Sequence, residues 1–226
     1  MKSLDDFIGI HEGKRAFIAC NGPSLNDIPM EKLRGEIVFG LNRGYMKDGL
    51  PITYLVIMVS MIIRQWREEI IKVPCDTLFT NHLNVPHACK INFGGRAFCT
   101  NFEKTVHRGH TVTYLAMQLA FRMGFKKVYC IGLDHSFKYD NTIKDKSHHR
   151  AVITKGHDLN HFDPDYFGDG AKWLPYSPKA VEGNFKLATE AFYRNGRELW
   201  NASTKTALSG KIIPRIDFNS IWEGEI

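Results

Sequence analysis

Arg15–Leu25, with the sequence RAFIACNGPSL, decides the fold of this chain. An apolar run is followed by the turn residues Asn21, Gly22, Pro23 and Ser24, which lead toward a helix. In α/β sheets, such a strand end presents backbone N–H groups, small polar side chains and a helix N-terminus to a phosphate. The same residue types are also the commonest in ordinary turns. The pattern therefore predicts a buried strand, and it leaves phosphate binding and a plain turn as alternatives.

Short apolar runs alternate with amphipathic helices along the rest of the chain. The clearest helix is Thr111–Met123, which Gly124 ends, and the clearest strand is Lys127–Leu133. Further strands are predicted at 15–20, 36–41, 52–58, 76–80, 199–202 and 212–216, and further helices at 60–72 and 178–195. This alternation predicts an α/β fold, a Rossmann-like, doubly wound, mostly parallel sheet. We expect one domain over residues 1–226, with the polar residues 135–177 as a lid or insertion and an irregular stretch from 81 to about 108.

The composition is that of a soluble globular protein, with 226 residues, 43% of them hydrophobic and 24% charged. The N-terminus lacks the apolar stretch of a signal peptide, which predicts a cytoplasmic protein. Five cysteines without a CxxC pair fit reduced thiols. The net charge of +6 indicates an anionic partner. Because Lys and Arg are scattered, the sequence favours a small phosphorylated ligand, or peripheral contact with an acidic membrane surface, over nucleic acid. The sequence is also compatible with a protein that forms oligomers.

Two further predicted strands end in polar or flexible residues. These residues are Asn42 and Arg43 after one strand and Gly132, Asp134, His135 and Ser136 at the end of the other. Because the carboxyl ends of parallel strands meet at one edge of a sheet, where open α/β sheets bind ligands, we expect them to line one cleft with Asn21. Asp134 fits a contact with a ribose hydroxyl, a divalent metal or a substrate amine, and a plain helix N-cap is the less favoured alternative.

The start of the helix at Thr111 is a second candidate anion site. Small hydroxyl residues after a glycine suit a phosphate or carboxylate at a helix N-terminus, and they equally suit a capped helix with nothing bound.

One histidine is a candidate general base. His157 and His161 have the i,i+4 spacing of metal ligands, but no cysteine lies nearby and Pro164 interrupts the segment, so we expect no metal site. His161 stands in NHFDPDYF, beside aromatic residues that would desolvate it and carboxylates that would orient it. General acid or base chemistry is therefore one interpretation of His161, and a surface loop histidine is the other.

The motifs CNGPSL, GLNRGY, GHTVTY and VYCIGLDHSF, in this order, resemble the 6-hydroxymethylpterin diphosphokinase-like family, which includes the motility accessory factors implicated in glycosylating flagellin. The later segments HFDPDYF and LWNA continue the match, which spans about residues 14–218. The turn and the strand ends are more distantly similar to the bacterial lipooligosaccharide sialyltransferases. Those enzymes use CMP-sialic acid and have a single Rossmann-like domain with a lid.

This resemblance implies which residues contact the nucleotide and the sugar of the donor. Asn21, Gly22 and Ser24 would meet the phosphates of the nucleotide. Asn42 would contact the nucleotide or the donor sugar, and Thr111 would contact the carboxylate or phosphate of the donor.

The resemblance also implies roles nearer the reaction, with two departures. Asp134 would bind near the ribose or substrate, and His161 would deprotonate the acceptor hydroxyl as the sugar leaves CMP. The family usually has an asparagine after the third strand, where this chain has Val59. The sialyltransferases have tyrosines shortly after the aspartate to assist the leaving phosphate. Here Ser136 follows, with Tyr139 as a stand-in.

Three functions follow as hypotheses. The first is a glycosyltransferase that moves a sugar, a nonulosonic acid such as sialic acid, from a CMP-activated donor to a hydroxyl of a glycan or protein acceptor, with no cofactor. The second is diphosphate transfer from ATP to a hydroxymethylpterin, which needs Mg²⁺ and makes Asp134 a metal ligand. The third is a nucleotide-binding module without catalysis, which the departure at Val59 would fit.

Overall fold

The computed structural model describes residues 2–83, 85–95, 97–100 and 105–223, and its centre is a seven-stranded sheet. The strand order is β10-β6-β1-β2-β3-β4-β5, and each neighbouring pair is parallel. The strands are β1 (Arg15–Ala19), β2 (Val38–Leu41), β3 (Tyr54–Val56), β4 (Thr77–Thr80), β5 (Ala88–Lys90), β6 (Lys127–Ile131) and β10 (Glu198–Asn201). The predicted α/β, mostly parallel sheet is confirmed.

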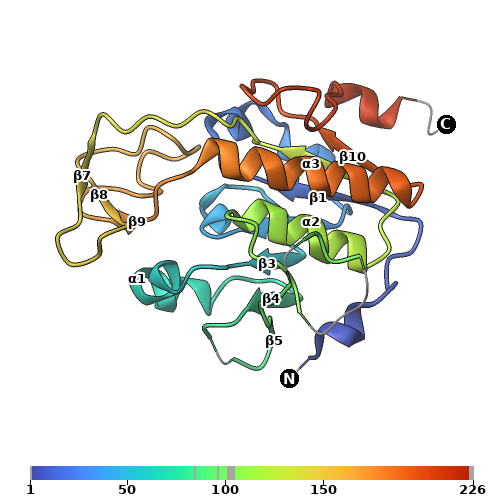
Figure 1. Cartoon of the computed structure of the whole chain (residues 1–226), viewed down its shortest axis with the longest axis horizontal. Helices are drawn as coiled ribbons and strands as arrows, with labels where there is room; N and C mark the ends of the chain where they lie inside the picture. The colour runs from blue at the N-terminus through green and yellow to red at the C-terminus, as the bar shows by residue number, and fades with distance from the viewer. Residues whose placement is uncertain (1, 84, 96, 101–104, 224–226) are drawn as a thin grey trace.

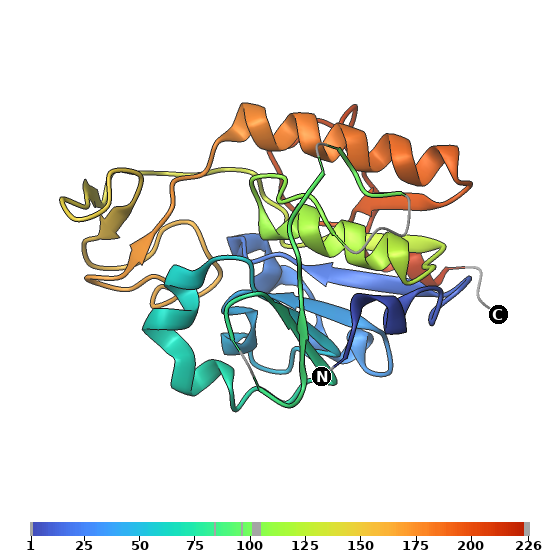
Figure 2. The same ribbon diagram turned by 60° about the horizontal axis from the view of Figure 1, so that its bottom comes forward.

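Helices cover both faces of this sheet. They are α1 (Ser60–Ile70), α2 (Val112–Arg122) and α3 (Pro178–Arg194), with the short 3₁₀ helices η1 (Leu4–Phe7), η2 (Pro23–Asp27), η3 (Met30–Leu33), η4 (Gly44–Met46) and η5 (Asn219–Trp222). Figures 1 and 2 show α2 and α3 side by side over one face. Apolar residues of η2, η3, α1 and η5 pack on the other face. None of the described helices combines the length and apolarity needed to cross a bilayer.

The helix α2 is the central element of its layer. Every one of its 11 residues is buried, because the sheet lies under it and α3 lies beside it. Thr111 caps its N-terminus by accepting a hydrogen bond from the N–H of Thr113. Gly124 follows its C-terminus with a φ of +91°, a left-handed conformation that glycine adopts without strain. The sequence signals at both ends of this helix are therefore confirmed.

The order in which strands are added to the sheet switches at β1. The strands β2 to β5 follow one another on one side of β1, whereas β6 and then β10 lie on its other side. Ligands of open α/β sheets bind beyond the carboxyl ends of the strands at such a switch point. The fold therefore places a binding crevice where the segments around Asn21 and Asp134 leave the sheet.

Residues 135–177 form an insertion with a small sheet of its own. This sheet is antiparallel and consists of β7 (Thr142–Lys144), β8 (Val152–Thr154) and β9 (Lys172–Trp173). Figure 1 shows it at the left, beside α1 and beyond the main sheet. The sequence predicted only a polar segment here, because strands this short leave little alternation to detect. Phe162, Tyr166, Phe167 and Trp173 join the insertion to the apolar core around α1.

Two further predictions of secondary structure are wrong. Residues 212–216 do not form a strand; they make one isolated bridge, between Asn201 and Arg215. Pro214 has no N–H to donate, and the N–H groups of Ile212 and Ile213 donate to Ser209, so no ladder extends from the bridge. The stretch after residue 80, predicted to be irregular, contains the short edge strand β5.

Candidate active site

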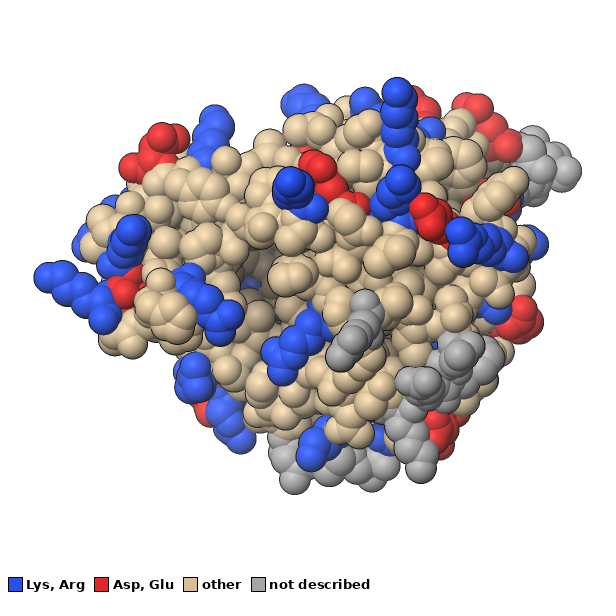
Figure 3. All heavy atoms as spheres, viewed as in Figure 1, with Lys and Arg blue, Asp and Glu red and all other residues tan. Residues whose placement is uncertain are grey.

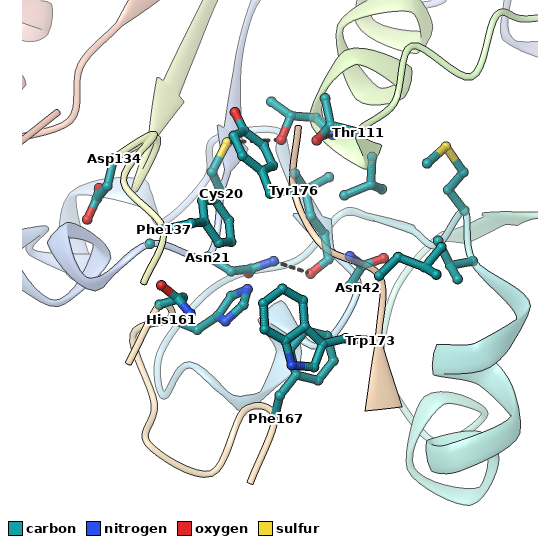
Figure 4. A pocket seen from close by; sticks show the side chains of 18 of the residues that line it. Cys20, Asn21, Asn42, Thr111, Asp134, Phe137, His161, Phe167, Trp173 and Tyr176 are labelled. Carbon is teal, nitrogen blue, oxygen red and sulfur yellow. Dashed lines mark hydrogen bonds between the residues drawn. The ribbon is translucent and has the colours of Figure 1, made fainter. Parts of the chain in front are cut away.

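A cavity of about 210 Å³ lies beyond the carboxyl ends of β1, β2, β3 and β6. The start of α2 and the insertion complete its walls. Figure 4 shows Cys20, Thr111 and Tyr176 on one side of it and His161 and Trp173 on the other. The fold therefore encloses a space between the switch point of the sheet and the insertion.

Most of the predicted site residues line this one cavity. Those in its lining are Asn21, Gly22, Asn42, Thr111, Gly132, Asp134, His135, Ser136 and His161. The three polar strand ends are therefore together, as the parallel sheet requires. Pro23, Ser24 and Arg43 lie behind the lining, where Ser24 and Arg43 bind other parts of the protein.

The backbone around the cavity is held in unusual conformations. Asn42, His110 and His135 have φ values of 48°, 63° and 55°, and no other non-glycine residue of the described chain has a positive φ. All three line the cavity. Such left-handed conformations cost free energy and concentrate at functional sites.

The ends of β1 and β6 approach each other so closely that glycine is required. A Cβ on Gly22 would lie 2.6 Å from the Asp134 Cγ and 2.7 Å from the carbonyl oxygen of Gly132. The N–H of Gly22 donates to that same carbonyl over 2.9 Å. Gly22 therefore closes the gap between two strand ends, in addition to any contact with a ligand.

Asp134 is bound to the turn after β1. Its carboxylate accepts hydrogen bonds from the backbone N–H of Ser24, over 2.9 Å, and from the Ser24 hydroxyl. Burial raises the pKa of the Asp134 carboxyl above its usual range, and the two hydrogen bonds from Ser24 only partly oppose this effect. Figure 4 shows the carboxylate directed away from Thr111 and Asn42. The N–H groups of Gly22 and Ser24 are thus already occupied, whereas the start of α2, from Thr111 to Thr113, lines the cavity.

His161 and Asp158 form a hydrogen-bonded pair. The His161 Nδ1 lies 2.7 Å from the Asp158 Oδ2, and the side chains are 12% and 4% exposed. Asp158 also accepts from the backbone N–H groups of Asn160 and Phe167, which fix its position. With Nδ1–H donated to the carboxylate, the His161 Nε2 is the nitrogen left to accept a proton.

Tyr166 supports the ring of His161. The two rings are stacked, with centroids 4.0 Å apart and planes 6° apart. The buried Tyr166 hydroxyl accepts from the Asn21 amide, over 2.9 Å, and from the backbone N–H of Arg43. Burial raises the pKa of the Tyr166 hydroxyl, so it stays neutral. The imidazole is therefore positioned by the ends of β1 and β2, through one phenol.

A second histidine, His135, is hydrogen-bonded on both sides of its ring. Its Nε2 lies 2.9 Å from a Glu182 oxygen, and its Nδ1 contacts the hydroxyl of Tyr176. Tyr176 lines the cavity and stacks on Phe137 at 4.3 Å. Tyr139 is not in the cavity lining; its hydroxyl clamps the backbone N–H and C=O of Tyr176.

The side of the cavity next to β3 and α1 is apolar. Met58, Val59, Met61 and Ile62 line it, and the stacked rings of Phe167 and Trp173 belong to the same apolar cluster as Val59 and Ile62. One cationic side chain, Lys172, is in the described lining, and it pairs with Asp145 over 3.0 Å. Figure 3 shows a hollow between the insertion and the body of the molecule, with Lys and Arg side chains on both sides of it. An anionic ligand would enter past these charges.

Sequence reasoning missed three residues of this site: Asp158, Tyr176 and Glu182. Tyr166 is one of the aromatic residues that the sequence predicted beside His161, and it stacks on that ring. Asp158 stands three residues before His161, but the prediction relied on the aspartates of HFDPD instead. Tyr176 and Glu182 contact His135 over sequence separations of 41 and 47 residues. No local pattern reports such contacts.

The comparisons with known proteins give structural likeness only. No protein-family model matches the chain, and no curated protein matches it in sequence. Among solved structures, the sialyltransferase CstII from Campylobacter jejuni in complex with the substrate analogue cytidine-5'-monophosphate has a TM-score of 0.51 at 17% identity, over 92% of this chain and 88% of that chain. A structure of the sialyltransferase CST-II in complex with CMP has a TM-score of 0.51 at 15% identity, over 88% and 85%. This chain therefore shares its fold with those sialyltransferases.

Proposed function

We propose that the protein is a glycosyltransferase that moves a sugar, a sialic acid-like nonulosonic acid, from a CMP-activated donor to an acceptor hydroxyl. The observation that supports this most is the His161–Asp158 pair on the same cavity as the N-terminus of α2. A base and an anion site on one cavity are what displacement of a phosphate by a hydroxyl requires. The two similar structures are of a sialyltransferase with CMP bound, which supports this choice of donor.

His161 is the general base of the proposed reaction. Asp158 fixes the tautomer in which Nε2 accepts a proton, and Tyr166 fixes the plane of the ring. As the acceptor oxygen attacks the sugar carbon, its proton passes to the His161 Nε2. A positioned base of this kind contributes about 10²–10⁴-fold to the rate.

The phosphate of the donor binds at the start of α2. Thr111 caps this helix, the first residues of the helix line the cavity, and Tyr176 lies on the same side. The positive end of the helix stabilises the negative charge of the departing phosphate. Asn21 and Asn42 line the same cavity, where they meet the nucleoside or sugar, and Asp134 holds the turn after β1 through Ser24.

The proposed reaction needs no metal ion, because the base is the His161 imidazole and the N-terminus of α2 binds the leaving phosphate. Binding of CMP, cytidine, UMP, GTP and ATP with Mg²⁺ is measured by calorimetry. CMP is expected to bind in EDTA, and the release of CMP from CMP-sialic acid is expected to be unchanged by EDTA. Binding of ATP that requires Mg²⁺, without binding of CMP, would contradict the proposal and favour diphosphate transfer.

The base is tested with His161→Asn and a matched control. This variant is expected to lower the release of CMP from CMP-sialic acid with an added glycan acceptor by about 10²-fold or more, with CMP affinity within threefold. The control is His157→Asn, which changes an exposed histidine of the same insertion. Equal turnover in both variants would rule out His161 as the base. CMP binding by a wild-type protein without turnover of CMP-sugars would support a non-catalytic module.

A further inference from the structure

The insertion carries a large share of the exposed apolar side chains. Eight large hydrophobic residues are exposed in the described part of the chain, and four of them lie in residues 135–177: Tyr139, Ile143, Leu159 and Leu174. Their exposed fractions lie between 37% and 47%. Single apolar residues are normal on the surface of a soluble protein, whereas several in one segment mark a surface that binds something.

The small sheet β7-β8-β9 has one packed face and one exposed face. Val152 lies opposite Trp173, and both are buried in the core that joins the insertion to α1. Ile143 lies opposite Ile153, which lies opposite Lys172, and residues paired in this way point to the same side of an antiparallel sheet. Ile143 is 47% exposed and Ile153 is half-buried. This second face therefore presents aliphatic side chains to solvent.

The turn between β7 and β8, residues 144–150, adds positive charge next to this face. Lys144, Lys146 and Arg150 are exposed, and none of the three pairs with a carboxylate of the described residues. The one carboxylate in the turn, Asp145, is buried and has an ion pair of its own. Figure 1 shows the small sheet at the left end of the molecule, and Figure 3, in the same view, shows Lys and Arg side chains there.

We propose that the exposed face of β7-β8-β9 and the turn 144–150 form a docking surface for a membrane that contains anionic lipids. Aliphatic side chains beside unpaired cations are the combination that binds at a bilayer interface, because the apolar groups enter the acyl boundary and the cations attract the headgroups. A nucleic acid would use the cations but not Ile143. A second copy of this chain would bring a net charge of +6 toward the same turn.

The docking surface adjoins the cavity. Lys172 and Leu174 line the cavity and belong to the same part of the insertion as the exposed face. Docking would therefore hold the cavity close to the bilayer. Because these two residues serve the cavity as well, the decisive variants leave them unchanged and alter only the turn and Ile143.

Binding to lipid vesicles tests the cationic turn. The wild-type protein is expected to bind vesicles of phosphatidylcholine with about one third phosphatidylglycerol, and to bind vesicles of phosphatidylcholine alone at least about tenfold more weakly. One Lys or Arg near an anionic surface contributes about fivefold to such binding. The triple variant Lys144→Gln, Lys146→Gln, Arg150→Gln is therefore expected to bind the anionic vesicles about 100-fold more weakly in co-sedimentation.

A matched triple variant separates a docking surface from the net charge of the protein. Lys186→Gln, Arg194→Gln and Lys211→Gln remove the same charge at exposed positions outside the insertion. This control is expected to weaken binding to the anionic vesicles by less than about tenfold. Equal weakening in both triple variants would show that overall charge alone attracts the lipid, and it would overturn the docking surface. So would a wild-type protein that does not bind anionic vesicles.

The apolar part of the surface is tested with two exposed aliphatic residues. Ile143→Ser is expected to weaken binding to the anionic vesicles by about fivefold, because less apolar surface enters the bilayer. Leu187→Ser, at a side chain of α3 that is 41% exposed, is the control and should bind as wild type. Equal binding by both variants would overturn the role of the sheet face, and a dimer that Ile143→Ser abolishes would assign this face to a second copy instead. An unchanged melting temperature shows that each variant is folded. None of these measurements uses a sugar donor, so they decide the docking surface independently of the proposed function.

Discussion

At the scale of single residues, the direction of the His161 ring depends on one buried carboxylate. Asp158 accepts three hydrogen bonds, from His161 and from two backbone N–H groups. In Asp158→Asn the amide cannot accept all three, and it no longer stabilises the imidazolium. We expect kcat to fall by about 10²-fold or more with CMP affinity nearly unchanged. Steady-state kinetics measure this, and Asp165→Asn, at a side chain that is 75% exposed, should behave as wild type.

A second carboxylate controls the acid stability of the insertion. The N–H and hydroxyl of Ser147, together with Lys172, lower the pKa of Asp145 from 3.8 to about 2. Its ionised form is therefore favoured by folding, so its contribution is fully present above about pH 4 and is lost as the pH falls toward 2. Asp145→Asn is expected to lower the melting temperature at pH 7 and to converge with wild type as the pH falls through this window. A difference that stays constant down to pH 2.5 would contradict the low pKa.

At the scale of elements, replacing glycine by alanine should have opposite effects on stability in α3 and at the end of β1. Gly183 is exposed inside α3, and a Cβ there would meet no atom within 4 Å, so Gly183→Ala should raise the free energy of unfolding by about 0.5–1 kcal/mol. Gly22→Ala places a Cβ against Asp134 and Gly132 and should lower it by about 1–3 kcal/mol. Urea denaturation measures both. Stabilisation by Gly22→Ala would show that the strand ends are looser than described.

The elements also show what can be predicted from a sequence of this kind. The strands β1 and β6 and the helix α2 have strong local patterns, and the polar residues at the strand ends follow from the sheet being parallel. Asn21, Asn42 and Asp134 could therefore be placed together before the structure was known. The short strands of the insertion have no such pattern, and pairings such as His135 with Glu182 join residues 47 apart in sequence. Those contacts depend on the tertiary fold and not on any local signal.

At the scale of the whole molecule, Arg43 joins the sheet, α1 and the insertion. It follows β2, its side chain is 7% exposed, and it donates to the backbone carbonyls of Asp165 and Tyr166. Its guanidinium lies 4.2 Å from the centre of the Trp66 ring and 3.2 Å from a Glu69 oxygen, both in α1. This one side chain therefore fixes the segment that presents His161 against the rest of the protein.

Removal of Arg43 should loosen that segment without unfolding the sheet. Arg43→Ala leaves two carbonyls without their donor, and hydrogen bonds to a charged group contribute about 1.5–3 kcal/mol. Amide hydrogen exchange in residues 158–167 is therefore expected to accelerate about tenfold or more, while exchange in β1 and β6 stays slow. Arg67→Ala, at an exposed arginine of α1, is the control and should leave exchange in residues 158–167 unchanged. Because the same segment positions His161, kcat should fall with this acceleration; faster exchange throughout the sheet would mean that Arg43 stabilises the fold as a whole and not the placement of the insertion.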